Sequence, residues 1–182
     1  MIFNIVAEFD LIKKPSWLDA FRLKYDEPYR YHISFKTLTY FNEKKLENLK
    51  NELKIIANAY SSIGVIFNEL YINITSKGGC IMIKAKSNKK LFKLQDEISN
   101  RFSKFGKHIS EEYKKFEKNF NPHITIGRHL TAEQLKRAKN DLRNDLFVEA
   151  LVDNLVLSVA KEDTFEEWFN PKNKLSFKLQ KE

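Results

Sequence analysis

The chain has 182 residues, a length that supports one sizeable hydrophobic core but is too short for two large independent domains. It is 42% hydrophobic and 13% aromatic with only 5 Gly and 4 Pro, which excludes a disordered or low-complexity chain. The net charge of +8 favours polyanionic partners such as RNA, although a lysine-rich composition also arises without selection for binding.

The N-terminal segment, residues 1–10, lacks the basic region and apolar run of a signal peptide, and no apolar stretch is long enough to cross a bilayer. A single cysteine, Cys80, excludes an internal disulfide and a multi-cysteine metal site. We therefore expect a cytoplasmic protein without a membrane segment, acting as a monomer.

The first half of the chain alternates between predicted strands and helices. A β-type run over 2–9 precedes a short helix that Ser16 caps. The aromatic and β-branched segment 29–41 predicts a strand. A helix over 43–60 follows, for which Asn42 is a good N-cap and the apolar residues fall on one stripe.

The second half repeats this alternation. Strands are predicted over 63–86, broken by a turn at 76–79, and Asn88 caps the next helix. A capping box, Thr131 with Gln134, then starts a helix over 132–144. The repeated order predicts an internal duplication, with lobes over about 1–75 and 80–160 inside a single domain, 1–182, and with exchange of terminal segments between the lobes allowed.

All four histidines have Ser or Thr two residues later, so this spacing alone does not identify which histidines are catalytic. Thr131 after His129, and Ser110 after His108, are better explained as helix caps. The remaining two pairs lie among alternating bulky apolar residues, which puts histidine and hydroxyl on one face of a strand. These pairs are His32 with Ser34 and His123 with Thr125.

Two imidazoles and two hydroxyls around a shared cleft suit a phosphodiester substrate. One neutral histidine can take a proton from water while the other, protonated, gives a proton to the leaving oxygen. The hydroxyls of Ser34 and Thr125 can donate hydrogen bonds to the non-bridging oxygens as negative charge builds. We therefore predict His32 and His123 as catalytic, Ser34 and Thr125 as phosphate-binding, and neither a metal nor a cofactor.

The two motifs, YHISFKT and PHITIGR, lie about 90 residues apart and resemble those of the two-histidine (2H) phosphoesterase superfamily. The 2′-5′ RNA ligase-like branch is the most similar. The second motif matches that branch closely, and the first has Ser34 in place of the commoner threonine. The late segment VDNLVLSVAKED is similar to the family's late core strand, so the resemblance covers most of the chain.

The resemblance implies an α+β fold of two lobes related by a pseudo-two-fold axis, each an antiparallel sheet with outer helices, around a central cleft. The implied activity is hydrolysis of RNA 2′,3′-cyclic phosphates, or cleavage or joining of 2′-5′ linkages, on RNA or oligonucleotide substrates. The motifs do not choose between these reactions, nor do they assign acid and base to His32 and His123.

Two basic residues are weaker candidates for substrate contact. Lys36 shares strand parity with His32 and Ser34, so it could neutralise a phosphate. Arg128 has the opposite parity to His123, so it points away from the phosphate unless the strand bulges.

Three alternatives stay open at this point. The chain could be a phosphodiesterase of small nucleotides, such as 2′-5′ oligoadenylates or cyclic nucleotides, using the same four residues. It could also be a non-catalytic basic RNA-binding module, in which alanine at both histidines would leave RNA affinity unchanged. A histidine metal site carries little weight, because no carboxylate or cysteine lies at ligand spacing beside His123 and His129.

Overall fold

The computed structural model describes residues 1–26, 30–75 and 78–181 and contains two five-stranded antiparallel sheets. The first sheet has the order β10-β9-β1-β3-β6 and the second the order β2-β8-β4-β5-β7. The first consists of β1 (Ile2–Phe9), β3 (Tyr31–Phe41), β6 (Gly106–His108), β9 (Asn154–Ala160) and β10 (Lys174–Lys178). The second consists of β2 (Leu11–Lys13), β4 (Ile63–Thr75), β5 (Gly78–Ala85), β7 (His123–Leu130) and β8 (Val148–Val152).

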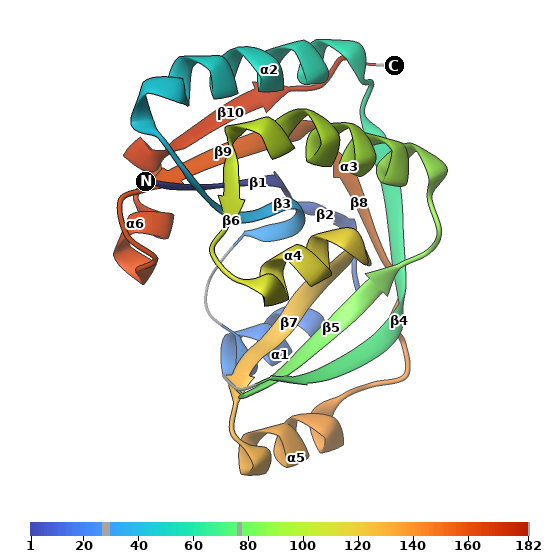
Figure 1. Cartoon of the computed structure of the whole chain (residues 1–182). Helices are drawn as coiled ribbons and strands as arrows, with labels where there is room; N and C mark the ends of the chain where they lie inside the picture. Colours follow the sequence, from blue (N-terminus) through green and yellow to red (C-terminus); the bar gives the residue numbers. More distant parts are fainter. Residues whose placement is uncertain (27–29, 76–77, 182) are drawn as a thin grey trace.

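Helices cover the outer sides of both sheets (Figure 1). The α-helices are α1 (Leu18–Tyr25), α2 (Leu46–Ala59), α3 (Lys89–Phe102), α4 (Glu111–Lys118), α5 (Ala132–Asp141) and α6 (Phe165–Phe169). Short 3-10 turns occupy η1 (Glu43–Lys45), η2 (Ser103–Phe105) and η3 (Pro171–Asn173). Helices α2 and α3 pack on the first sheet, α1 and α5 pack on the second, and α4 lies against β3 and β6.

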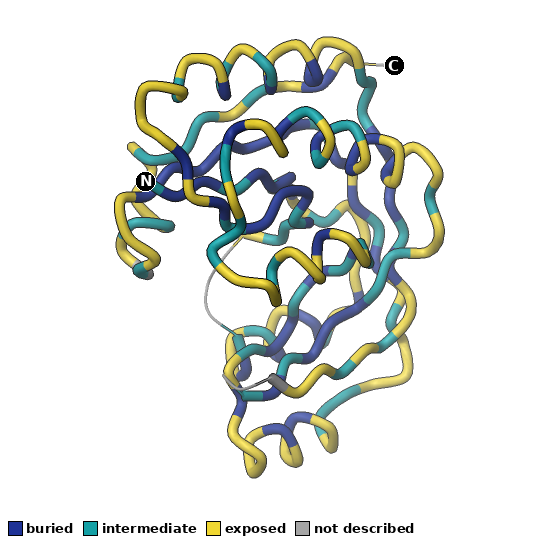
Figure 2. The backbone as a smooth tube through the Cα atoms, viewed as in Figure 1, coloured by how far each residue is buried: buried dark blue, intermediate teal, exposed yellow. Residues whose placement is uncertain are grey.

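The core lies between the sheets and these helices, as the dark segments of Figure 2 show. The apolar stripe predicted for the helix over 43–60 is buried, and α3 buries a similar stripe. On α2, Leu49, Leu53 and Ile56 are fully buried, and on α3 the stripe from Leu91 to Phe102 is buried. None of the described helices is long and apolar enough to cross a membrane.

Each sheet contains one strand with a motif histidine: β3 lies between β1 and β6 in the first sheet, and β7 is an edge strand of the second. Strand β3 pairs with β1, and β7 pairs with β5, in each case with a helix in the intervening chain. The α+β fold with two antiparallel sheets, outer helices and a cleft between them is confirmed. The sheets do not coincide with the predicted lobe bounds of 1–75 and 80–160, because β4 lies in the second sheet and β9 in the first.

Most predicted helix caps are confirmed. The side chains of Asn42, Asn88 and Ser110 accept hydrogen bonds from the backbone N–H groups of the following turn, and Thr131 forms the full capping box with Gln134.

Other details differ from the sequence predictions. The cap at Ser16 is wrong: α1 begins one residue later than expected, and its N-cap, Trp17, makes no side-chain hydrogen bond. The helix predicted over 43–60 is a 3-10 turn followed by α2, and α5 ends at Asp141 rather than 144. The predicted turn at 76–79 lies partly outside the described residues, as does the start of the strand predicted from residue 29.

Candidate active site

The two motif histidines lie at the starts of β3 and β7 and line the cleft between the sheets. His32 lines a cavity of about 370 Å³, and His123 lines one of about 430 Å³. Arg128 and His129 line both cavities, so these are two parts of one cleft. Strands β3 and β7 are in contact, which brings together two histidines from positions far apart in the sequence.

Both histidines are oriented by the same device. Nδ1 of His32 lies 3.1 Å from the backbone carbonyl oxygen of Arg30, and Nδ1 of His123 lies 2.7 Å from that of Asn121. Because a carbonyl oxygen only accepts, each Nδ1 carries the proton and donates it, which leaves Nε2 for chemistry. An edge-to-face contact with Phe116, 5.8 Å between ring centroids, further fixes the His123 ring.

The hydroxyls lie on the same strand faces as the histidines. Around both motifs the intermediate and buried residues alternate, with Ile33 and Ile124 buried and Ser34 and Thr125 partly accessible. Thr125 lines the same cavity as His123. Ser34 lines a third cavity, of about 520 Å³, which shares His129 with the other two.

The electrostatic environment favours the neutral form of both rings. Burial lowers the pKa of His32 to about 4 and also lowers the pKa of His123, while the carbonyl hydrogen bonds oppose the change. The positive charge of Arg128 lowers both pKa values further. A phosphate placed between the rings would counter this effect, because its negative charge favours the protonated form of a nearby histidine.

Arg128 reaches the cleft because β7 bulges. The pairing of β7 with β5 shifts register twice, between Met82 and Ile81 and again between Ile81 and Gly79, so the simple alternation from His123 does not extend to Arg128. The Arg128 side chain is held by Asp26, whose Oδ1 accepts from Nε at 2.7 Å. From the sequence, Arg128 was expected to point away from the phosphate unless the strand bulged. The bulge is present, and the guanidinium lies near both histidines.

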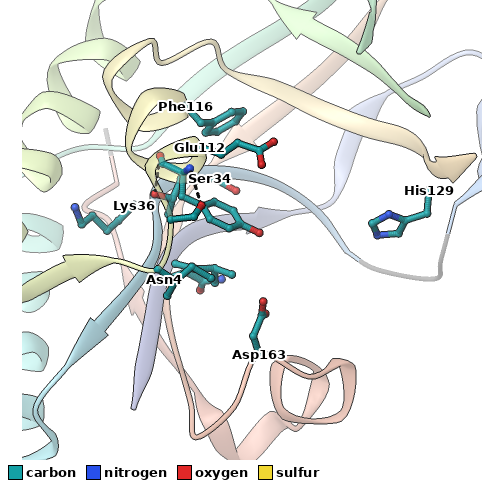
Figure 3. Close-up of a pocket in the computed structure, with 12 residues that line it drawn as sticks. Asn4, Ser34, Lys36, Glu112, Phe116, His129 and Asp163 are labelled. Atoms are coloured by element: carbon teal, nitrogen blue, oxygen red, sulfur yellow. Dashed lines mark hydrogen bonds between the residues drawn. The ribbon is translucent and has the colours of Figure 1, made fainter. Parts of the chain in front are cut away.

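Lys36 lines the same cavity as Ser34, but its ammonium is paired inside the protein. The pairing of β3 with β1 shifts register between Ser34 and Lys36, so the simple alternation from His32 does not extend to Lys36. Its ammonium is 2.7 Å from a carboxylate oxygen of Glu117, and both side chains are almost completely buried. Figure 3 shows Lys36 pointing away from His129 and Asp163.

Several cleft residues were not predicted from the sequence. His129, expected as a turn residue, has a left-handed backbone with φ of 54° and lines all three cavities. Tyr113 and Phe116 come from α4, and Trp168 comes from α6. Tyr113 and Phe116 are three residues apart on a short helix, and this spacing could have predicted that they share one helix face.

Within the described residues, no three His, Cys, Asp or Glu side chains are grouped so that they could hold a metal ion. The cleft instead combines histidines, hydroxyls and a guanidinium, which are groups that bind an anion and move protons.

A family model and several solved structures match this chain. A model of the 2′-5′ RNA ligase superfamily matches residues 12–164. The structure is similar to that of TT0787 from Thermus thermophilus, with a TM-score of 0.59, 15% identity and all of both chains covered.

Two further solved structures share the fold. Kluyveromyces marxianus Usb1 has a TM-score of 0.55 and 13% identity, with 98% of each chain covered. E. coli LigT, complexed with 3′-AMP, has a TM-score of 0.53 and 12% identity, with 99% of this chain and 97% of that chain covered. The chain thus belongs to the 2′-5′ RNA ligase superfamily and is a 2H phosphoesterase.

Proposed function

We propose that this enzyme hydrolyses 2′,3′-cyclic phosphates at RNA ends by acid–base catalysis between His32 and His123. The observation that carries the proposal is the matched orientation of the two rings: each donates Nδ1–H to a backbone carbonyl, which leaves two Nε2 atoms for the substrate. Cleavage or joining of 2′-5′ linkages uses the same groups, and the substrate panel below separates these reactions.

In the proposed reaction, one neutral Nε2 accepts a proton from water as the water oxygen bonds to phosphorus. The bond from phosphorus to one ribose oxygen breaks, and the other histidine, protonated at Nε2, gives its proton to that oxygen. The products are a free hydroxyl and a phosphomonoester. Both proton transfers are between histidines and oxygen atoms, so the reaction needs no metal.

Three groups would stabilise the charge on the phosphoryl oxygens. Ser34 and Thr125 are proposed as hydrogen-bond donors, and Arg128 contributes a positive charge from the centre of the cleft. In this proposal Lys36 does not contact the substrate, because its ammonium is bound to Glu117 inside the protein.

LigT was solved with 3′-AMP and Usb1 with uridine monophosphate, and both ligands are mononucleotides. By analogy, we expect the cleft of this enzyme to bind the terminal nucleotide of an RNA. We also expect a cytoplasmic monomer, which light scattering on the purified protein and fractionation of cells would test.

The test is a substrate panel in EDTA: a nucleoside 2′,3′-cyclic phosphate, an RNA oligonucleotide ending in that group, and a 2′-5′-linked dinucleotide. We expect turnover of the first two, and the double variant His32→Ala/His123→Ala serves as the inactive control. Turnover of the dinucleotide alone would replace cyclic phosphate hydrolysis with 2′-5′ cleavage. An inert wild type that still binds RNA would favour the non-catalytic binding module.

A further inference from the structure

The cavity that Ser34 lines extends from β3 to residues of α4 and of the segment before α6. We refer to it as the Tyr113 cavity; its volume is about 520 Å³. Aromatic rings of Tyr113 and Phe116 from α4 form one wall, and Leu38 and Ile109 add apolar surface. Aromatic walls of this kind bind nucleobases by stacking, without discrimination between them.

Two carboxylates in the cavity could distinguish one nucleobase from another. Glu112 enters from α4 and Asp163 from the segment before α6, on opposite sides of the cavity (Figure 3). Asp163 Oδ1 accepts a hydrogen bond from Trp168 Nε1 at 2.8 Å, whereas Glu112 has no hydrogen bond or ion pair with any described side chain. Carboxylates repel phosphate and accept only from N–H and O–H donors, so the cavity selects a part of the substrate that carries donors.

Asn4 adds a third acceptor. This residue lies on β1 between the fully buried Phe3 and Ile5, so its side chain faces the cleft, and it lines both the Tyr113 cavity and the cavity of His32. Its Oδ1 atom is buried and has no hydrogen-bond partner among the described residues. A buried acceptor without a partner favours a ligand that brings a donor.

The chemistry of the substrate identifies those donors. This step rests on the proposed function. In a nucleoside 2′,3′-cyclic phosphate the 2′ and 3′ oxygens are both esterified, and the N–H donors of the substrate all belong to the base. Guanine presents N1–H and the N2 amino group side by side, which matches the two oxygens of one carboxylate. Adenine and cytosine place an acceptor beside their amino group, and uracil flanks N3–H with two carbonyl oxygens that a carboxylate repels.

We propose that the Tyr113 cavity binds the base of the terminal nucleotide and selects guanine, with Glu112 as the acceptor of N1–H and N2–H. Asp163 and Asn4 border the same base and complete the set of acceptors. Glu112 is exposed on the first turn of α4, so its replacement by glutamine is expected to leave the fold intact.

The experiment compares kcat/KM for the four nucleoside 2′,3′-cyclic phosphates in wild type, Glu112→Gln and Glu111→Gln. Glu111 is the matched control, because it lies on the same turn of α4, is exposed, and pairs with Lys114 outside the cavity. We expect the wild type to prefer guanosine over uridine by at least about tenfold, as loss of a charge-assisted pair of hydrogen bonds implies. Glu112→Gln should remove most of that preference, chiefly by lowering kcat/KM for the guanosine substrate, and Glu111→Gln should keep it.

A wild type without guanine preference, or a preference unchanged in Glu112→Gln, would overturn the inference. If none of the four substrates turns over, the proposed function fails instead, and binding still tests the cavity. Calorimetry with guanosine and uridine 3′-monophosphates should then show tighter binding of the guanosine ligand, by about tenfold or more, in wild type but not in Glu112→Gln. Equal affinities would contradict guanine selection independently of catalysis.

Discussion

Arg128 places one guanidinium near both histidines, and its charge makes each harder to protonate. Catalysis requires one neutral and one protonated ring, so kcat/KM should follow a bell-shaped dependence on pH. Both pKa values lie below the ordinary value of about 6.5 for histidine, that of His32 at about 4. As pH rises past the upper of the two, both rings become neutral and the acid is lost, so the optimum for the free enzyme lies on the acidic side of neutrality.

Replacing Arg128 therefore shifts the profile in a defined direction. In Arg128→Gln the loss of positive charge raises both pKa values, so both limbs of the kcat/KM profile move to higher pH, and kcat falls because a transition-state contact is lost. The control is Arg137→Gln, which removes an equal charge from an exposed pair with Glu133 on α5 and should leave the profile in place. A profile that Arg128→Gln does not move would contradict the electrostatic role given to this residue.

For single residues, the sequence predicted which strand face carries the motif residues. It did not predict where the side chains of Lys36 and Arg128 point. The placement of His32, Ser34, His123 and Thr125 on cleft-facing strand positions follows from simple alternation. Simple alternation does not place Lys36 or Arg128, because each lies beyond a β-bulge. A bulge depends on how the partner strand packs, so it cannot be deduced from the alternation of one strand.

At the scale of elements, a buried ionic cluster attaches α4 to the first sheet. The carboxylate of Glu117 accepts from Lys36 Nζ, from Ser99 Oγ and from the backbone N–H of Thr37, and lies 2.9 Å from His108 Nε2. Burial alone would raise the pKa of Glu117, but the hydrogen bonds and charge of these partners lower it. The cluster thereby positions the helix that carries Tyr113 and Phe116.

Breaking this cluster should destabilise the whole domain. Glu117→Ala leaves the Lys36 ammonium buried without its partner, so the free energy of unfolding should fall by about 3–5 kcal/mol, measured by urea denaturation. The double variant Lys36→Met/Glu117→Leu removes both charges and should recover most of the loss. A loss below about 1 kcal/mol in Glu117→Ala would mean that the ion pair does not hold α4 in place.

The helices were largely predictable because their caps and apolar stripes are local features, as on α2 and α3. The strand β8, the helix α6 and the strand β10 were not predicted. Helix α6 has only five residues, and β10 is held by its pairing with β9 rather than by a pattern of its own. Trp168, which this region brings to the cleft, was missed for the same reason.

At the scale of the molecule, the site exists only because two sheets meet. Each sheet carries one histidine, oriented by the carbonyl two residues earlier, and strand β4 of the first half joins the second sheet while β9 of the second half joins the first. The duplication was visible in the sequence as a repeated order of elements. The exchange of strands between the halves was not predictable in detail, because strand pairing across such distances is decided by the packing of the complete domain.

In the proposed reaction His32 and His123 divide the acid and base roles, and a change of leaving group is the sharpest test of this division. A p-nitrophenyl phosphodiester of a 2′-deoxynucleoside releases a leaving group that needs no proton, unlike the cyclic phosphate. We expect His32→Ala and His123→Ala each to slow turnover of the cyclic phosphate by about 10²–10⁴-fold. On the aryl ester, one variant should recover most of the wild-type rate, which identifies the acid, while the other stays slow. The division of roles would be contradicted if both variants, or neither, recovered the wild-type rate on the aryl ester. It would also be contradicted if either variant hydrolysed the cyclic phosphate at the wild-type rate.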